Sequence, residues 1–522
     1  MKNSVKMIGL VVLAVVITFF IYLSTRNQPA RVSVDALPVA EETQSVTLKD
    51  GESFELSANP VKKTINGQTV KMLAYNGSIP GPLIEVEQGA EVTVHFTNNT
   101  DIATTIHPHG VRVENANDGV PDVTQALIQP GQDFTYALSF PDAGVYWYHP
   151  HFREDYAQEL GLYGNFLVKP SDDAYWSAVN GEAVVFLDDI LLDKNGAAFN
   201  KEVADHTLMG RFGNVMLVNG STDYRLQVPA GAVERFYLTN AANTRPFNIA
   251  IPGAKLKLVG ADNGKYEKET FVESVLLGPS ERAIVEAYFP KAGAYPFVHR
   301  TPGKVYTLGT ITADEAVAQP SLSASFNMAR LNSDVIASID PFRAEFNRAP
   351  DKVLRLTLNM RGMGGPAGTH QMQGGGMMMD SQMGMSAPAG GIEWEDDMGA
   401  MNEGSTSQTL VWQLRDEATG AVNMDIHDWD FRVGDRVKVR VINDAHSMHP
   451  MQHPIHFHGQ RFLILSRDGQ KETNMVWKDT AFIPAGQTVD LLIEMSNPGI
   501  WMAHCHISEH LEAGMMLQYR VQ

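Results

Sequence analysis

One passage rich in aromatic residues and histidine occurs three times along the chain, and it constrains the fold more than any other feature of the sequence. Its copies are 143–151 (AGVYWYHPH), 292–300 (AGAYPFVHR) and 498–506 (PGIWMAHCH). A second shared passage precedes each copy, at 89–94 (GAEVTV), 231–236 (GAVERF) and 434–439 (GDRVKV). Because two different passages recur in the same order, we expect three homologous domains that repeat one structural unit.

The segments around these passages are typical of short β-strands. Examples bounded by Gly, Asn or Asp are 83–86 (LIEV), 91–96 (EVTVHF), 233–238 (VERFYL) and 436–442 (RVKVRVI). Residues of these types favour strands, and helical periodicity is scarce beyond the N-terminal segment. A chain of 522 residues is also too long for one core. The sequence therefore predicts an all-β protein of three tandem β-sandwich domains, at 45–172, 173–320 and 321–522.

The first 44 residues read as a signal or anchor followed by a tether. Lys2 and Lys6 precede an apolar run at 7–23, which is the pattern of an export signal. The run just reaches the length of a spanning helix, so it favours an uncleaved anchor over a removed signal peptide. We expect an exported protein, periplasmic or otherwise extracytoplasmic, anchored to the inner membrane by residues 7–23.

The net charge argues against a nucleic-acid-binding protein, and the cysteine content excludes a disulfide-stabilised one. The chain has 60 acidic and 41 basic residues, and its net charge of −19 disfavours nucleic acid and favours metal cations. Its single cysteine, Cys505, excludes disulfides within the chain. Nucleic-acid binding is therefore not expected, and the role of Cys505 has to be inferred from its neighbours.

Histidines gather in four passages, all in the first or third repeat. They are His107 and His109; His149 and His151; His453, His456 and His458; and His504, His506 and His510. Residues i and i+2 of a strand face the same side, so each His-x-His pair can present two imidazoles to one metal site. A single pair is more often a surface or core pair, but four sets at equivalent points of a repeat favour metal binding. The middle repeat lacks such pairs, so metal chemistry is expected in the outer two domains.

The surroundings of Cys505 indicate which metal is bound. A thiolate with two imidazoles and a weak axial thioether is the ligand set of a blue-copper centre, and His453, Cys505, His510 and Met515 supply that set. Structural zinc would need more thiolates than one cysteine provides. On an extended strand, the side chains of His504 and His506 point away from that of Cys505. Cys505 therefore forms a short covalent path between a copper on one face and coppers on the other.

The four histidine motifs, with 75–82 (YNGSIPGP) and 161–164 (GLYG), resemble the conserved motifs of the multicopper oxidase family, which includes laccases and cuprous oxidases. The resemblance extends from about residue 45 to the end of the chain. It implies three cupredoxin-like Greek-key domains and four copper ions, of which one is type 1, one is type 2 and two are type 3. It assigns His107 and His456 to type 2 copper, His109, His149 and His506 to one type 3 copper, and His151, His458 and His504 to the other.

The resemblance also implies an acid that supplies protons for the reduction of O₂. Asp118, in the sequence Asn-Asp-Gly-Val-Pro at 117–121, matches a family acid near the type 2 copper. The alternative interpretation is an ordinary Asp-Gly turn residue. We expect Cys505 and Asp118 to be catalytic, with Glu512 as a second candidate acid. Leu511 stands where some cuprous oxidases carry an acid, so that relay is not expected in the same form.

A segment rich in Met and Gly, at 360–401 in the third domain, bears on the substrate. Thioethers bind Cu(I), and cuprous oxidases of the bacterial envelope carry such an insertion. Met451 matches a substrate-copper ligand of those enzymes, whereas His449 replaces an acidic residue. The candidate Cu(I) ligands are therefore Met377, Met378, Met379, Met383, Met451 and His449. The alternative is a low-complexity loop of no catalytic consequence.

Three functions remain open at this stage. The favoured one is oxidation of Cu(I) in copper tolerance, coupled to four-electron reduction of O₂ to water. A laccase-like oxidation of phenols or aromatic amines would use the same coppers. A copper-sequestering envelope protein would bind metal without turnover, although the complete ligand set argues against it. The expected partners are O₂, Cu(I) or a small aromatic reductant, and the membrane through the N-terminal segment, and a monomer is expected.

Overall fold

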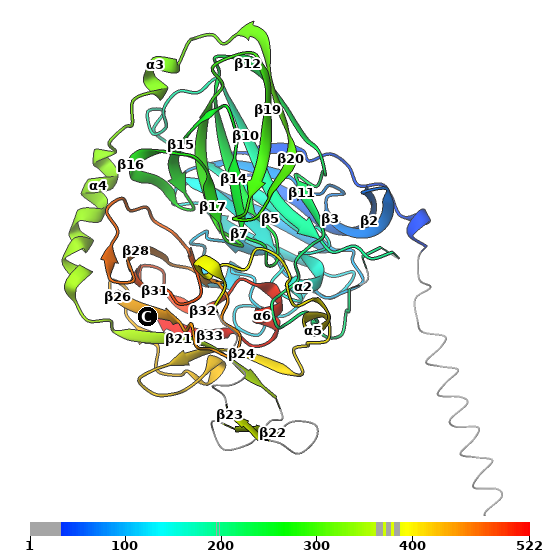
Figure 1. The fold of residues 1–522 in the computed structure, drawn as a ribbon, viewed down its shortest axis with the longest axis vertical. Coiled ribbons are helices and arrows are strands. Elements are labelled where there is room, and N and C mark those ends of the chain that lie inside the picture. The colour runs from blue at the N-terminus through cyan, green and yellow to red at the C-terminus, as the bar shows by residue number, and fades with distance from the viewer. Residues whose placement is uncertain (1–32, 195, 198, 362–368, 372–376, 380–386) are drawn as a thin grey trace, which may run out of the picture.

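Three pairs of β-sheets follow one another along the chain (Figure 1). The computed structural model describes residues 33–522 except 195, 198, 362–368, 372–376 and 380–386, and no side chain between 362 and 386. Each pair of sheets encloses its own apolar core, as expected when alternating residues of a strand face inward. The prediction of an all-β protein of three tandem sandwich domains is confirmed.

The first domain carries two of the histidine motifs. Its sheets have the strand orders β3-β2-β5-β7 and β1-β4-β9-β8-β6. The strands are β1 (Ser45–Leu48), β2 (Ser53–Ile65), β3 (Gln68–Tyr75), β4 (Leu83–Glu87), β5 (Glu91–Asn98), β6 (His107–His109), β7 (Asp133–Ser139), β8 (Gly144–His149) and β9 (Gly164–Lys169). In β5, Val92, Val94 and Phe96 are buried and alternate with more exposed residues, which is the pattern of a strand with one face on a core.

The second domain lies beside the first and has no histidine pair. Its sheets have the orders β11-β10-β13-β18-β15-β16 and β12-β20-β19-β14-β17. The strands are β10 (Gly181–Ile190), β11 (Val215–Val218), β12 (Tyr224–Ala230), β13 (Val233–Asn240), β14 (Phe247–Ala250), β15 (Lys255–Ala261), β16 (Gly264–Val272), β17 (Val275–Leu277), β18 (Arg282–Tyr288), β19 (Gly293–Arg300) and β20 (Val305–Val317). Strand β18 begins at Arg282, which contacts both the first and the third domain.

The third domain carries the other two histidine motifs. Its sheets have the orders β24-β21-β26-β31-β28-β29 and β25-β33-β32-β27-β30. The strands are β21 (Lys352–Met360), β24 (Leu410–Asp416), β25 (Asp430–Phe431), β26 (Arg436–Asn443), β27 (His453–Phe457), β28 (Arg461–Arg467), β29 (Gln470–Lys471), β30 (Thr480–Ile483), β31 (Thr488–Glu494), β32 (Gly499–Cys505) and β33 (Met516–Val521). A separate hairpin pairs β22 (Thr369–Gln371) with β23 (Met377–Met379).

Short helices fill the connections between strands. They are α2 (Glu154–Ala157), α3 (Ser323–Phe326), α4 (Ser333–Ile339), α5 (Gly399–Glu403) and α6 (Ser508–Glu512), with 3₁₀ turns η1 (Val34–Ala36), η2 (Asn115–Asn117), η3 (Asp340–Asn347), η5 (Ala389–Gly391) and η6 (Asn423–Asp425). The connection through α3, α4 and η3 runs along the outside, from the second domain to the third (Figure 1). Its apolar residues Val335, Ile339 and Phe342 pack in one cluster with residues of β28 and β31.

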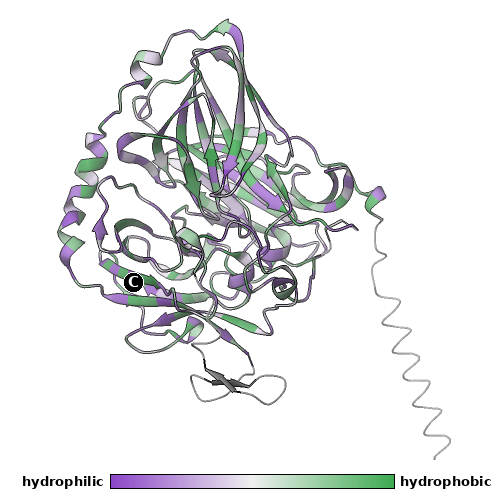
Figure 2. Ribbon diagram, in the orientation of Figure 1, coloured by the Kyte–Doolittle hydropathy of each residue, from purple (hydrophilic) through white to green (hydrophobic). Residues whose placement is uncertain are grey.

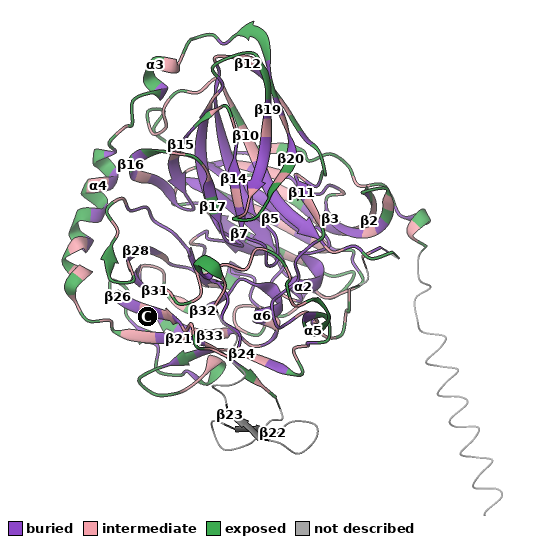
Figure 3. Cartoon of the chain, viewed as in Figure 1, coloured by how far each residue is buried: buried purple, intermediate pink, exposed green. Residues whose placement is uncertain are grey.

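Hydropathy and burial agree along the strands. Apolar residues gather on the sheets of each domain (Figure 2), and the same strands are the buried ones (Figure 3). The outer connection through α3 and α4 is largely exposed (Figure 3). The folded body therefore consists of three cores, and the ends of strands from different domains meet between them.

Two predicted segments are only partly described. The signal or anchor at 7–23 lies outside the described residues, among which no helix is long and apolar enough to cross a membrane. Of the predicted insertion at 360–401, Met360 ends β21, Gly391 is buried within η5, and residues 399–401 begin α5. The Met and Gly content of this segment shows no strand or helix period and so predicts no packed element, which is wrong for its two ends, where Met360 and Met398 pack against the core of the third domain. Met383 lies outside the described residues, as do the side chains of Met377, Met378 and Met379.

Candidate metal centres

Two pairs of adjacent strands bring the four histidine motifs together. In the first domain β6 pairs with β8, which places His107 opposite His149. In the third domain β27 pairs with β32, which places His456 opposite His504 and Ile455 opposite Cys505. Because both strand pairs end where the first and third domains meet, the imidazoles of the two domains converge on one buried region.

One group of side chains surrounds Cys505. Its Sγ lies 3.5 Å from His453 Nδ1 and 3.9 Å from His510 Nδ1, and these two nitrogens are 3.3 Å apart. Met515 is fully buried, and its carbonyl accepts a hydrogen bond of 3.1 Å from the Cys505 amide. Three converging ligand atoms of soft and intermediate character beside a thioether residue match the donor set of a blue-copper site.

Eight further imidazoles form a second group on the other side of Cys505. Three sets have ligand atoms within 4.8 Å of one another: His107, His109 and His456; His109, His149 and His506; and His151, His458 and His504. In the last set, His458 Nε2 lies 3.3 Å from His151 Nε2 and 3.0 Å from His504 Nε2. The two sets assigned to type 3 copper by resemblance are thus brought together in space, each with residues from both domains.

Hydrogen bonds to carbonyl oxygens determine which nitrogen of several rings faces inward. His504 Nδ1 lies 2.8 Å from Cys505 O, His149 Nδ1 lies 2.8 Å from Pro150 O, and His107 Nδ1 lies 2.7 Å from Asp118 O. A carbonyl can only accept, so in each ring Nδ1 carries the proton and Nε2 keeps its lone pair. Outer partners of this kind orient the histidine ligands of metal sites. The buried Nε2 atoms of His107 and His456 make no hydrogen bond, as expected of ligand atoms.

Burial keeps these imidazoles neutral. It lowers the pKa of His504 to about 4 and that of His453 to about 3, and it holds the pKa of His458 and His506 well below the usual value. Neighbouring imidazoles add to the effect, because a proton on one ring repels a proton on the next. Burial also raises the pKa of the Cys505 thiol. Metal binding at Cys505 would therefore release its proton, whereas the histidines are already in the ligating form.

Asp118 lies against two of these histidines. It is fully buried, and its Oδ2 accepts a hydrogen bond of 2.9 Å from His458 Nδ1. Its Oδ1 is 3.3 Å from His107 Nδ1 and makes no hydrogen bond. Asp118 therefore contacts both a type 2 and a type 3 candidate ligand. Glu512 lies farther out, where its Oε1 accepts from the Arg153 amide at 3.1 Å, and burial and Asp155 raise its pKa to about 8.

The histidines around Cys505 are covered by a tryptophan. The Trp412 ring stacks on His510 with centroids 4.2 Å apart and contacts His453 at 4.8 Å. Trp412 Nε1 donates a hydrogen bond of 2.7 Å to Thr207 O, which holds the Trp412 ring against the second domain. His453 and His510 are 1% and 0% exposed, so neither ring presents an open edge to solvent.

The two candidate Cu(I) residues of this region lie beside the same tryptophan or in the core. His449 is 2% exposed, neither of its ring nitrogens has a hydrogen-bond partner, and its ring centroid is 6.5 Å from that of Trp412. Burial lowers the pKa of His449 to about 4, and the Asp396 carboxylate opposes that effect. Met451 is fully buried and belongs to the core cluster of the third domain.

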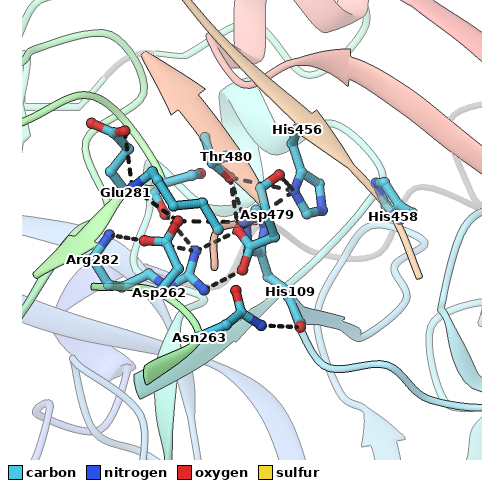
Figure 4. Close-up of polar contacts among 12 residues, drawn as sticks. His109, Asp262, Asn263, Glu281, Arg282, His456, His458, Asp479 and Thr480 are labelled. Atoms are coloured by element: carbon cyan, nitrogen blue, oxygen red, sulfur yellow. Dashed lines mark hydrogen bonds and ion pairs between the residues drawn. The ribbon is translucent and has the colours of Figure 1, made fainter. Parts of the chain in front are cut away.

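Several residues of the site escaped the sequence interpretation. They are Trp412, which covers His510; Glu154, whose Oε1 lies 3.7 Å from His151 Nδ1; and Asp479, Thr480 and Arg282, which surround His109 and His456 (Figure 4). Asp479 and Thr480 begin no motif, and Arg282 belongs to the domain without paired histidines. For Asp479, the only available signal was its position directly before β30, which pairs with the histidine strand β27.

Known proteins are similar to this chain in both sequence and fold. Three models of the family described as multicopper oxidase match residues 58–173, 181–318 and 397–522. Multicopper oxidase MmcO of Mycobacterium tuberculosis is 27% identical over 88% of this chain and 85% of its own length. Laccase-1 of Botryotinia fuckeliana is 26% identical over 91% of this chain and 83% of its own length.

A solved structure, the multicopper oxidase from Campylobacter jejuni described as a metallo-oxidase, superimposes with a TM-score of 0.66 at 25% identity, covering 93% of this chain and 98% of the other. The relatives span nearly the whole chain, and family matches fall on each of the three sandwich domains. The chain therefore belongs to the multicopper oxidase family, whose members are copper-dependent oxidoreductases.

Proposed function

We propose that this protein is a cuprous oxidase that uses four copper ions to oxidise four Cu(I) and reduce one O₂, with four protons, to two molecules of water. His453, Cys505, His510 and Met515 would hold the type 1 copper. His107 and His456 would hold type 2 copper, and the sets His109, His149, His506 and His151, His458, His504 would hold the type 3 pair. When bound, these coppers supply one-electron redox chemistry and the place where O₂ is reduced.

The fit of the donor set supports this use of copper. The Cys505 group offers one thiol and two imidazoles that converge within 4 Å, and the second group offers only buried imidazoles. The two groups are joined by the covalent chain itself, because His504 and His506 flank Cys505. The neutral state of the histidines means that binding a cation there displaces few protons.

Asp118 is the acid that we propose for proton delivery to O₂. Its Oδ2 is engaged by His458, whereas its Oδ1 is buried and free of hydrogen bonds. A carboxyl oxygen in that state can hold a proton beside the type 2 and type 3 ligands and pass it inward. The same contacts let Asp118 orient His458, so both roles follow from one position.

The observation that favours Cu(I) over phenols is the burial of the type 1 histidines. Electron transfer from a phenol needs close approach of its ring to a histidine edge, and these rings are buried beneath Trp412, which is held in place by its hydrogen bond to Thr207 O. A small cation needs less space. His449 offers two free ring nitrogens beside Trp412, and the Asp396 carboxylate acts on it electrostatically. A net charge of −19 attracts cations to the molecule as a whole.

The test compares two substrates on the same preparation. O₂ uptake should give a higher kcat/KM with Cu(I) than with a bulky phenol, and His449→Phe should lower the Cu(I) value about tenfold while leaving phenol turnover unchanged. His446→Phe is the matched control, because His446 lies on the same loop and is exposed.

Faster turnover of phenols than of Cu(I), with no effect of His449→Phe, would assign the protein to laccase-like oxidation. Tight copper binding without O₂ uptake from either substrate would favour the sequestering alternative. We also propose that the reaction takes place outside the cytoplasm, which a fusion of residues 1–44 to a reporter that is active only after export would test.

A further inference from the structure

A buried arginine of the second domain reaches the shell around the histidines, although that domain has no histidine pair. Arg282, the first residue of β18, is 1% exposed and forms a two-point pair with Asp479 of the third domain. Its Nη1 donates to Asp479 Oδ1 at 2.7 Å and its Nη2 donates to Oδ2 at 2.5 Å. Figure 4 shows the Asp479 carboxylate held between this guanidinium and the two histidines His109 and His456.

Asp479 also contacts two candidate copper ligands and so links them to Arg282. Its Oδ1 lies 3.1 Å from His109 Nε2, and its backbone carbonyl lies 2.8 Å from His456 Nδ1. Carboxylate and carbonyl oxygens only accept, so His109 carries its proton on Nε2 and keeps the lone pair of Nδ1. That Nδ1 faces the cluster, where it lies 3.4 Å from His149 Nε2. The inward nitrogen of His109 is thus Nδ1, the opposite of His107 and His149.

Arg282 is itself held by all three domains. Its Nε donates to Val145 O at 3.0 Å, and Val145 lies on β8, the strand that ends at His149. Its amide donates to Asp262 Oδ1 at 2.8 Å within the second domain, and Asp262 Oδ2 pairs with Lys478 Nζ at 3.1 Å. The planar guanidinium, with five donors in a rigid fork, reaches Val145 O and both carboxylate oxygens of Asp479 at once, whereas a lysine could not.

We propose that Arg282 is a positioning residue for the site of the type 2 and type 3 coppers: by pairing with Asp479, it fixes the orientation of the His109 ring and keeps its proton on Nε2. The second domain thereby contributes to a site whose ligands all lie in the other two. The inference rests on the proposed copper role of His109, and it does not depend on which reductant the enzyme uses. The competing account is that the pair only joins the domains.

The experiment measures copper in purified holoenzyme variants. In Arg282→Met, the retention of type 3 copper should weaken by up to about 10- to 100-fold, the range seen when the outer partner of a metal ligand is lost, because Arg282 holds Asp479, the outer partner of His109. The blue absorption of the type 1 site should persist, and the share of EPR-visible copper should rise because the type 3 ions no longer couple. His109→Ala gives the reference for complete loss of this ligand.

The matched control is Arg235→Met. Arg235 is a second buried arginine of the same domain, 3% exposed and paired with Glu286 at 2.9 Å, but it contacts no candidate ligand. The Arg235→Met variant should keep a full complement of copper, and its type 3 ions should stay invisible to EPR. Equal copper loss in the two arginine variants would overturn the proposal in favour of general damage to the second domain.

A double variant separates positioning from the effect of an unpaired charge. Arg282→Met with Asp479→Asn removes both charges, but the free amide can rotate and offer its NH₂ group to His109. The proposal expects the type 3 defect to remain. Recovery of normal copper content and coupling in the double variant would refute it, as would normal values in Arg282→Met alone. If wild-type enzyme shows these coppers but fails to oxidise Cu(I), the cuprous oxidase proposal fails and the present one stands.

Discussion

Replacement of Gly110 by alanine should damage the protein through two separable effects. Gly110 directly follows His109 and has φ of +80°, a region that non-glycine residues avoid. A Cβ at this position would lie 2.2 Å from Asp479 Oδ2 and 2.8 Å from Arg282 Nη2. The methyl group would therefore strain the backbone and also push apart the Arg282–Asp479 pair.

The magnitude follows from a matched glycine in open space. Gly67 has the same φ of +80°, and a Cβ there would meet nothing within 4 Å. Gly67→Ala should cost only the backbone strain, about 1–2 kcal/mol. Gly110→Ala adds an overpacking cost of about 1–3 kcal/mol, so its total should reach about 2–5 kcal/mol. The copper content of the type 3 site should fall in Gly110→Ala alone.

The assay is guanidinium denaturation of the metal-free variants, followed by tryptophan fluorescence and combined with copper analysis of the holoenzymes. The difference between the two variants isolates the steric effect, since the two glycines have the same φ. If both variants lose the same stability and both keep their copper, the Arg282–Asp479 pair does not press on Gly110 in solution, and the reasoning is wrong.

Three further predictions concern the candidate acid Asp118, the covering residue Trp412 and the buried histidines. Asp118→Asn should lower O₂ uptake about 10- to 100-fold while the blue absorption stays unchanged, and normal uptake would exclude Asp118 from proton delivery. Trp412→Ala should cost about 3–5 kcal/mol of stability and raise phenol turnover relative to Cu(I), because His510 becomes accessible, and an unchanged ratio of the two specificity constants would contradict the shielding argument. The metal-free protein should lose stability as the pH falls from about 6.5 to about 4, because unfolded histidines bind protons in that window while His504, with its pKa lowered to about 4, does not. For His504 alone this amounts to roughly 3 kcal/mol, and a flat profile of unfolding midpoint against pH would show that the histidines are not shielded as described.

Much of the site could be predicted from sequence because its geometry is local. The His-x-His spacing puts two imidazoles on one face of a strand wherever that strand lies, and the neighbours of Cys505 are covalently fixed. The repeat of two passages indicated three domains and excluded the middle one as a source of paired ligands. The ligand inferences need only the period of a β-strand and the chemistry of thiolate and imidazole, the domain inference needs only the repeat, and the division into type 2 and type 3 ligands came from the family resemblance.

Other features were decided only by the tertiary structure, because they depend on contacts between distant residues. The sequence does not show that Trp412 covers His510, that His449 is buried without a partner, or that the ends of the segment at 360–401 are packed. Arg282 lies 197 positions from Asp479 and in a different domain, so no local pattern could pair them. The ring orientation of His109 and the lowered pKa values of the histidines likewise arise from burial and from neighbours that only the assembled domains provide.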